Sequence, residues 1–179
     1  NYFKIHNFEI KSSARIDDGA KINAMEIFQK GVEFATNYES NDDYVILAES
    51  VPSGTTTANA TALALGYKCD GYFSSSFKNA PKLSSVSDNM LIFNAGFILG
   101  STSKNLKVIL AGGTQMATVL LLVNSILESM QGEIDSSNIA LCTTKWINED
   151  EKSNIKALLE QLSFPINAYS STFDFKDSS

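Results

Sequence analysis

The chain of 179 residues has few of the side chains that build metal sites and disulfide frameworks. It contains two cysteines, Cys69 and Cys142, and one histidine, His6. The cysteines lack the CxxC spacing of a zinc site, and a disulfide scaffold needs more of them. A Ser-His-Asp triad would depend on His6 alone, which lies in a segment without periodicity. Mechanisms that use several histidines are excluded, and the cysteines are typical of small apolar residues in a reduced protein.

Charge and long apolar runs are also scarce. The formal net charge is −6, and charged residues make up 19% of the chain, below the usual value of about 25%. No basic block is present, although binding to nucleic-acid phosphates needs clustered Lys and Arg. The longest apolar run, at 117–123, is far shorter than the roughly 20 residues that span a bilayer. We therefore expect neither a nucleic-acid nor a membrane partner, and the low charge favours deep burial or a surface covered by a partner.

The first 20 residues mix charged and polar side chains with short apolar pieces. This pattern is not that of a secretory signal peptide. A cytoplasmic protein is therefore expected.

Short apolar runs alternate with longer segments of helical periodicity. Strands are expected at 44–48, 107–111, 139–143 and 166–169. Helices are expected at 23–36, 55–65, 86–99, 114–130 and 149–162, with Gly66 and Gly100 as stops after the second and third. Repeated strand–loop–helix units imply right-handed crossovers. The predicted fold class is α/β, an open, mostly parallel, Rossmann-like sheet with helices on both faces, in a single domain over residues 1–179 that stands alone or within a longer chain.

The first candidate site follows the strand that ends at Glu49. Ser53, Gly54, Thr55 and Thr56 form a turn rich in glycine and hydroxyl groups that opens a helix. A helix start favours phosphate because it offers free backbone amides and the positive end of the helix dipole. The alternative is a capped helix without a ligand. Glu49 could act as a base or orient a hydroxyl, and it could equally be a structural partner for free amides.

The second candidate site is the turn at Gly112, Gly113 and Thr114, where another strand runs into a helix. The glycines permit either close approach of a ligand or close packing of helix on strand. Since ligands bind beyond the carboxyl ends of parallel strands, the two turns could face each other across one cleft. A third candidate is Lys78 in the loop at 67–84, which could close over a phosphate or remain a solvated surface lysine.

At these residues the sequence resembles the nicotinate-nucleotide–dimethylbenzimidazole phosphoribosyltransferase family, especially its divergent archaeal and cyanobacterial branch. The run ILAESVPSGTTTANATALALGY at 46–67 is similar to that branch's acidic residue and P-G-G-T-T-T-like turn, with Ser53 in place of a usual glycine. The run VILAGGTQMATVLLLV at 108–123 contains its A-G-G-T-Q-M segment. The serine-rich loop at 74–76 is also similar to this branch.

The resemblance implies a cytoplasmic, homodimeric glycosyltransferase of cobalamin biosynthesis. Such a pentosyltransferase moves phosphoribose from nicotinate mononucleotide to a benzimidazole-type base. Matched by motif position, Glu49 would be catalytic, and the phosphate and ribose would be bound by Ser53, Gly54, Thr55 and Thr56, opposite Gly112, Gly113 and Thr114, with Lys78 nearby. No metal and no other cofactor is expected, because a helix start can hold one phosphate unaided.

The chain departs from the family pattern in one respect. Better-studied members use a glutamate near the carboxyl terminus, in an S-A-E-P-G-like segment, as the base that deprotonates the incoming azole. That segment is absent here, and family members are about twice as long. A non-catalytic nucleotide- or phosphate-binding module, or a truncated relative, is therefore the alternative function, and a small-molecule kinase with an atypical loop is a third.

Overall fold

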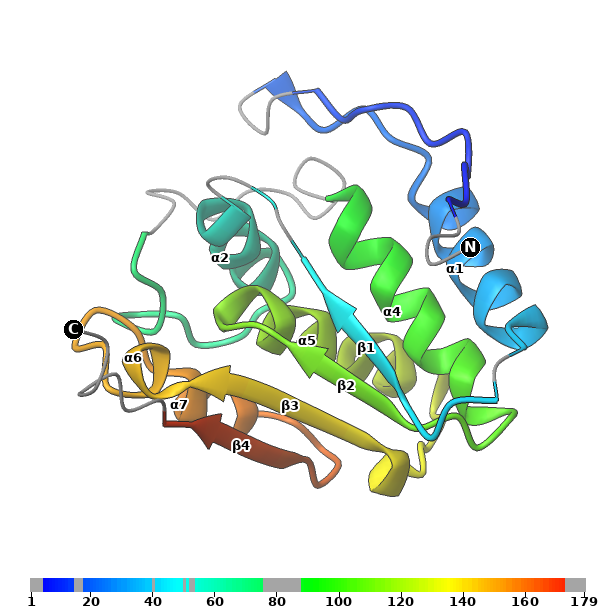
Figure 1. Ribbon diagram of the computed structural model, residues 1–179. Helices are drawn as coiled ribbons and strands as arrows, with labels where there is room; N and C mark the ends of the chain where they lie inside the picture. Colours follow the sequence, from blue (N-terminus) through cyan, green and yellow to red (C-terminus); the bar gives the residue numbers. More distant parts are fainter. Residues whose placement is uncertain are drawn as a thin grey trace, which may run out of the picture.

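The computed structural model describes residues 5–14, 18–39, 41–49, 51, 54–75 and 88–172. Four strands form one sheet in the order β1-β2-β3-β4, in which each strand lies beside the next one along the chain (Figure 1). They are β1 (Val45–Ala48), β2 (Val108–Ala111), β3 (Ile139–Thr144) and β4 (Asn167–Ser171). All three pairings are parallel, so the carboxyl ends of all four strands lie at the same end of the sheet, here called the carboxyl edge. The expected α/β fold with a parallel sheet is confirmed.

Helices fill the connections between the strands, and one further helix precedes β1. They are α1 (Ala24–Asn37), α2 (Gly54–Ala64), α4 (Asn89–Thr102), α5 (Thr114–Met130), α6 (Lys145–Asn148) and α7 (Ile155–Leu159), with a short 3₁₀ helix, η2 (Ser136–Asn138). In the part of the chain that the structure describes, no helix is long and apolar enough to cross a bilayer.

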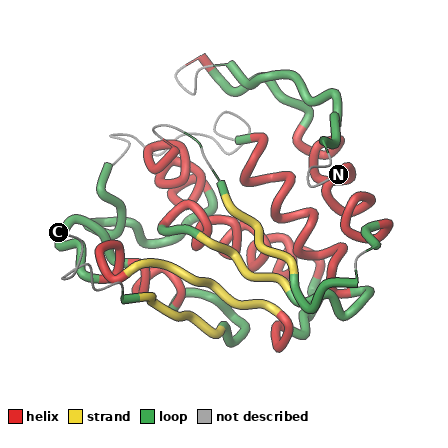
Figure 2. Tube along the Cα trace, viewed as in Figure 1, coloured by secondary structure: helices red, strands yellow, loops and turns green. Residues whose placement is uncertain are grey.

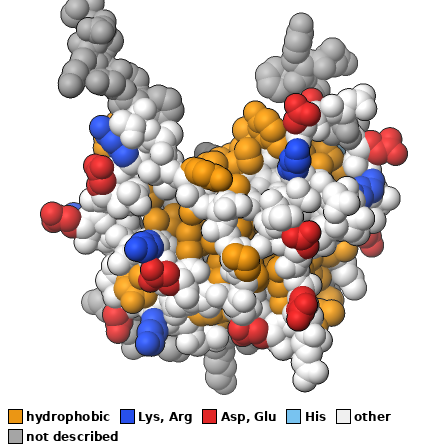
Figure 3. Space-filling model, turned by 90° about the horizontal axis from the view of Figure 1, so that it is seen from below, with side chains coloured by type: hydrophobic (Ala, Val, Ile, Leu, Met, Phe, Trp, Pro, Cys, Tyr) orange, Lys and Arg blue, Asp and Glu red, His pale blue; other side chains and the backbone are white. Residues whose placement is uncertain are grey.

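The described helices lie on one side of the sheet, and the other side is open (Figures 1 and 2). Alternate residues of β2 and β3 are buried beneath the helices: Val108, Leu110, Ile139 and Leu141. Their neighbours, which point to the other face, are only half-buried: Ile109, Ala140 and Cys142. The view from below shows hydrophobic side chains gathered across this open face (Figure 3).

This arrangement differs from the expected helices on both faces, and the strand order explains the difference. Each right-handed crossover leads to the next strand in the same direction, so each places its helix on the same side. A sheet with helices on both faces needs a reversal of strand order, and the order β1-β2-β3-β4 contains none.

Helix α5 is the centre of the hydrophobic core. Met116, Leu120 and Leu121 are completely buried between the sheet and the neighbouring helices. α5 contacts α2, α4 and α7. Burying one such side chain stabilises a fold by about 1.5–3 kcal/mol. The packing of α5 therefore stabilises the sheet that carries the candidate site.

Helices α1 and α4 pack so closely that three glycines face the partner's backbone. A Cβ on Gly96 would collide with the carbonyl of Phe28, and one on Gly100 with the carbonyl of Val32. Gly31 faces the carbonyl of Phe93 in the same way. The expected helix stop at Gly100 is therefore wrong: this glycine serves helix packing, and α4 continues to Thr102.

The expected helix at 149–162 is wrong in its extent, since residues 149–154 form a turn and the helix begins only at Ile155. Asp150 accepts hydrogen bonds through Oδ1 from the Lys152 amide at 2.9 Å and through Oδ2 from the Ser153 hydroxyl at 3.3 Å. Asn154 then caps α7 by accepting from the Ala157 amide at 2.9 Å. These side chains compete with helical backbone bonds, so only the short helix α7 (Ile155–Leu159) forms within the expected range.

Candidate functional site

The two glycine turns lie side by side at the carboxyl edge of the sheet. β1 and β2 are paired in register, with Ala48 opposite Ala111. Glu49 follows Ala48 directly, and Gly112 follows Ala111. The sheet therefore brings together the two segments that the sequence analysis expected to face each other.

Gln115, in the first turn of α5, connects the two turns. Its Nε2 donates a hydrogen bond to Glu49 Oε1 at 2.8 Å. Its side chain also packs against Gly54, where a Cβ would lie 2.6 Å from Gln115 Cδ. A side chain at position 54 would therefore displace the amide end of Gln115. In the sequence, Gln115 stands out only as the last residue of the second candidate turn and as part of the A-G-G-T-Q-M segment, without a role of its own.

Both oxygens of the Glu49 carboxylate are held. Oε2 accepts from the backbone amide of Val51 at 2.7 Å, and Oε1 accepts from Gln115. The side chain is half-buried. Glu49 therefore binds a backbone amide of the loop before α2, and it is also a negative charge in fixed orientation at the carboxyl edge.

Two buried polar atoms near this edge lack a hydrogen-bond partner among the described residues: Gln115 Oε1 and Thr143 Oγ1. Thr143 lies near the end of β3, two strands away from Glu49. Nearly all buried polar atoms in folded proteins are paired with protein or water. An unpaired acceptor beside Gly54 therefore marks a place where a donor from water or a ligand would complete the bonding.

Thr55 and Thr56 lie in the first turn of α2 and are half-buried. The hydroxyls of Thr56 and Ser75 are 2.8 Å apart and hydrogen-bonded. This bond brings the described part of the serine-rich loop against the start of α2. Ser53 and Lys78 lie outside the described residues, so their predicted roles stay predictions.

The second turn leads into α5 without a side-chain cap. Gly113 is the N-cap residue and forms no capping bond through a side chain. The Gly112 amide donates to the carbonyl of Cys142 at 3.0 Å, which ties the turn to β3. Thr114 is buried. The first backbone amides of α5, like those of α2, therefore have no partner within their own helix and lie at the carboxyl edge.

A hollow of about 610 Å³ adjoins the second turn. Gly112 and Gly113 form one side of it, and Cys142, Ile147 and Tyr169 contribute apolar surface. Hydroxyl residues from the ends of β3 and β4 complete the lining: Thr143, Thr144, Ser170 and Ser171. Its size and its mixture of apolar and hydroxyl groups suit a small aromatic molecule.

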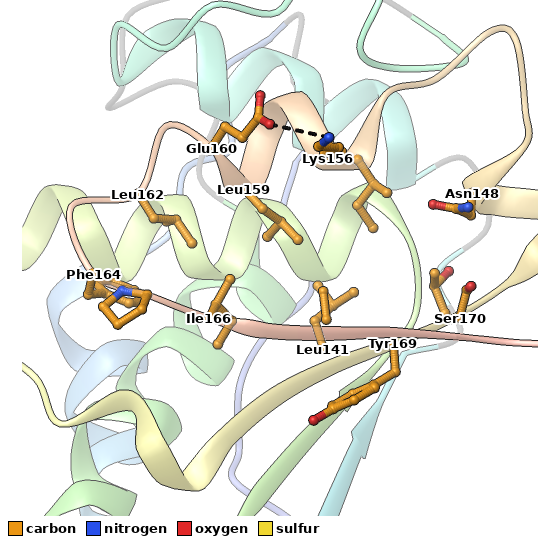
Figure 4. A pocket seen from close by; sticks show the side chains of 14 residues that line it. Leu141, Asn148, Lys156, Leu159, Glu160, Leu162, Phe164, Ile166, Tyr169 and Ser170 are labelled. Atoms are coloured by element: carbon orange, nitrogen blue, oxygen red, sulfur yellow. Dashed lines mark ion pairs between the residues drawn. The ribbon is translucent and has the colours of Figure 1, made fainter.

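A second hollow, of about 430 Å³, lies on the helix side of β3 and β4 (Figure 4). Leu141, Leu159 and Ile166 line it, and Tyr169 points away from them to the opposite side of the strand (Figure 4). Among the described residues that line this hollow, one ion pair forms, between the exposed side chains of Lys156 and Glu160 at 3.8 Å. The sequence analysis did not anticipate this hollow, and its mainly apolar lining offers few groups that could orient a polar ligand.

The described residues contain no cluster of three or more His, Cys, Asp or Glu side chains that could hold a metal ion. Burial, with a smaller contribution from Asp70, raises the pKa of the Cys69 thiol to about 11. Cys69 is therefore a neutral thiol at neutral pH and not an activated nucleophile.

Comparison with known proteins gives relatives and a shared fold. No model of a protein family matches the sequence. The chain is 33% identical to a UPF0284 protein of Methanocaldococcus jannaschii over 178 residues, which cover 85% of this chain and 49% of that protein. It is 35% identical to a UPF0284 protein of Sulfolobus acidocaldarius over 169 residues, which cover 83% of this chain and 46% of that protein. The chain thus spans about half the length of these curated relatives.

Among solved structures, the chain is similar to the nicotinate-nucleotide-dimethylbenzimidazole phosphoribosyltransferase from Thermus thermophilus. The TM-score is 0.58 at 15% sequence identity, and the match covers 88% of this chain and 52% of that chain. The likeness shows a common fold. The resemblance that the two glycine turns indicated is therefore confirmed, with archaeal UPF0284 proteins as homologues.

Proposed function

From its homology to the archaeal UPF0284 proteins and its phosphoribosyltransferase fold, we propose that this chain binds nicotinate mononucleotide at the carboxyl edge of the sheet. The proposed reaction transfers phosphoribose to a benzimidazole-type base and releases nicotinate. The observation that carries the proposal is the contact of Gln115 with both Glu49 and Gly54, which joins the two glycine turns.

The phosphate is proposed to lie at the start of α2. Free amides and the positive end of the helix dipole favour an anion there. Thr55 and Thr56 add hydroxyl donors in the same turn. The proposed roles of Ser53 and Lys78 at this phosphate rest on the sequence alone.

Glu49 is proposed to stabilise the transition state electrostatically. Departure of nicotinate leaves positive charge on the ribosyl carbon, and an oriented carboxylate stabilises such charge without reorganising. The bonds from Val51 and Gln115 supply that orientation. Gly112, Gly113 and Thr114 would form the opposite wall, with the adjoining hollow available to an aromatic ring.

A second candidate function is nucleotide binding without turnover. The observation that favours it is that the chain spans about half the length of its relatives, so groups that act on the acceptor base need not be present. The two candidates share one binding site and differ in whether a product forms. A homodimer and a cytoplasmic location remain parts of the proposal that the resemblance supports.

The binding step is tested by thermal unfolding with nicotinate mononucleotide and the variant Gly54→Val. At a concentration of 100 times Kd the ligand should stabilise the native protein by about 2.7 kcal/mol, a rise in Tm of about 5–10 °C. Gly54→Val should abolish the rise because the added side chain displaces Gln115. Gly132→Val is the matched control, because Gly132 follows the far end of α5 and a Cβ there meets Leu127 Cδ2 at an ordinary 3.4 Å.

Turnover is tested by looking for α-riboside phosphate after incubation with the nucleotide and dimethylbenzimidazole. Glu49→Gln should keep the rise in Tm while lowering turnover by about a hundredfold, because the charge is lost but the shape is kept. A rise in Tm without product would support the binding module. No rise at millimolar nucleotide would contradict both candidate functions.

A further inference from the structure

The open face of the sheet is an apolar surface of a kind that parallel sheets rarely leave uncovered. Parallel strands are normally buried on both faces, because their crossover helices cover both. Here the described helices cover one face, and the open face carries Tyr44, Ile46 and Tyr169, which are 50%, 55% and 61% exposed. Ile109 and Ala140 lie between them on β2 and β3. Hydrophobic side chains therefore gather on this face, with polar atoms between them (Figure 3).

Exposed large apolar side chains are concentrated here. Among the described residues, three of the eight lie on this face, and Trp146 and Ile147 of α6 lie at its carboxyl edge. The remaining three, Ile5, Met25 and Met130, lie outside the sheet. Scattered apolar residues are ordinary, whereas a contiguous patch marks an interaction surface.

The open face also has a recess that an apolar side chain could enter. A hollow of about 250 Å³ lies at the amino-terminal end of the strands. Tyr44, Ile109, Ala140 and Tyr169 are in its lining, and Lys107, Ser137, Asn138 and Asn167 add polar groups at its rim. Side chains of a packed helix insert into such recesses in layered α/β folds. The recess can therefore receive a side chain from a helix packed on this face.

We propose that helices from a polypeptide corresponding to the unmatched half of a UPF0284 protein cover this face. The chain spans 49% and 46% of two such relatives and 52% of the phosphoribosyltransferase. About half of the residues of those proteins therefore lie outside the matched segment, while the strand order accounts for only one layer of helices. A second copy of this chain fits less well, because two parallel sheets would then pack face to face, whereas parallel sheets are covered by helices. The inference does not depend on nucleotide binding, but Tyr169 also lines the hollow beside the second turn, so the two proposals meet at this residue.

The test measures how fast cysteines introduced on the open face react with iodoacetamide. Mass spectrometry identifies the modified positions and separates them from Cys69 and Cys142. Ile46→Cys and Tyr169→Cys report on the face, and Met25→Cys and Met130→Cys are controls at exposed apolar positions on α1 and α5. Each variant is measured as the 179-residue chain. It is then measured in a chimera with the unmatched part of the Methanocaldococcus jannaschii relative, and with that part added as a separate polypeptide.

The proposal predicts fast labelling of all four positions in the chain alone. In at least one of the two combined forms, the labelling rates of Ile46→Cys and Tyr169→Cys should fall by about tenfold or more. The two controls should keep their rates. Slow labelling in the chain alone, with the mass of a dimer in light scattering, would overturn the proposal in favour of a second copy. Unchanged labelling in both combined forms would overturn it as well, and circular dichroism of each variant excludes an unfolded sample as the cause.

Discussion

Helix α5 carries two polar side chains that are bonded very differently. Asn124, in its third turn, is fully buried. Its Nδ2 donates to the Tyr67 hydroxyl at 2.8 Å and to Glu128 Oε1 at 2.9 Å. Its Oδ1 accepts from the Ser163 amide at 2.8 Å and from the Ser163 hydroxyl at 2.6 Å. An asparagine side chain can form four hydrogen bonds, and Asn124 forms all four.

Gln115, at the start of the same helix, uses only part of its bonding capacity. It donates to Glu49, but its Oε1 is buried without a partner among the described residues. It also lies against a glycine rather than against packed side chains. The contrast separates two uses of a polar group in a core. A complete network joins elements of the fold, whereas an incomplete one beside a glycine leaves bonding capacity for water or a ligand.

The largest effect on stability is expected from Asn124→Leu. It leaves the Ser163 amide and hydroxyl without their acceptor, and unpaired buried groups cost about 1–3 kcal/mol each. We expect a loss of about 3 kcal/mol in the free energy of unfolding, measured by urea denaturation. Ser129→Ala, at an exposed position on the same helix, should change it by less than about 0.5 kcal/mol. Equal effects of the two variants would remove the distinction drawn for Asn124.

High pH should lower the stability of the region around Tyr67, which is hydrogen-bonded to Asn124. Burial, the larger cause in both cases, raises the pKa of the Tyr67 hydroxyl and raises that of the Cys69 thiol from 9.0 to about 11. The unfolded chain therefore loses these protons at lower pH than the native protein. Stability is complete below pH 9 and falls as the pH rises towards 11.

For Cys69 the two-unit shift corresponds to at most about 2.7 kcal/mol. Cys69→Ala should flatten the decline between pH 9 and 11 in urea denaturation repeated across that range. A decline of the same steepness in the variant would show that other groups cause it.

The smallest effect on stability is expected from Gln115→Met. The change removes one hydrogen bond, but it also removes the unpaired acceptor, so the free energy of unfolding should change by less than about 1 kcal/mol. The stabilisation by nicotinate mononucleotide should nevertheless be lost.

Gln161→Met is the matched control for Gln115→Met. Gln161 accepts from the Lys68 amide at 2.8 Å and donates to the Lys68 carbonyl at 3.0 Å, away from both glycine turns. It should lower stability by about 1–2 kcal/mol and keep the response to the nucleotide. If Gln115→Met kept the response while Gln161→Met lost it, the assignment of Gln115 to the site would be wrong.

Local patterns predicted much of the fold. The helix at 114–130 was expected with the observed bounds, and the four strands were expected within two residues of their observed ends. These elements are short apolar runs or one long periodic segment, and such patterns are properties of the local sequence. Gly100 was misjudged because a glycine that ends a helix and one that admits a neighbouring backbone read alike.

The candidate site was predictable in its two turns but not in the contact that joins them. Glycine turns after strands are visible in the sequence, and parallel pairing places them at one edge. The bond from Gln115 to Glu49 depends on which strands are neighbours and on side-chain direction. The open face escaped prediction for the same reason, because the sequence contains the crossovers but not the order in which their strands lie.

The order β1-β2-β3-β4 also affects how the chain can fold during synthesis. As the ribosome releases each new strand, its parallel neighbour has already emerged, so the strand can pair at once without displacing an earlier one. Contacts between consecutive units shorten the loops that must close, and short loops speed folding. Each new strand would be added beside the strand synthesised just before it. The partially built sheets would each resemble a smaller version of the finished one.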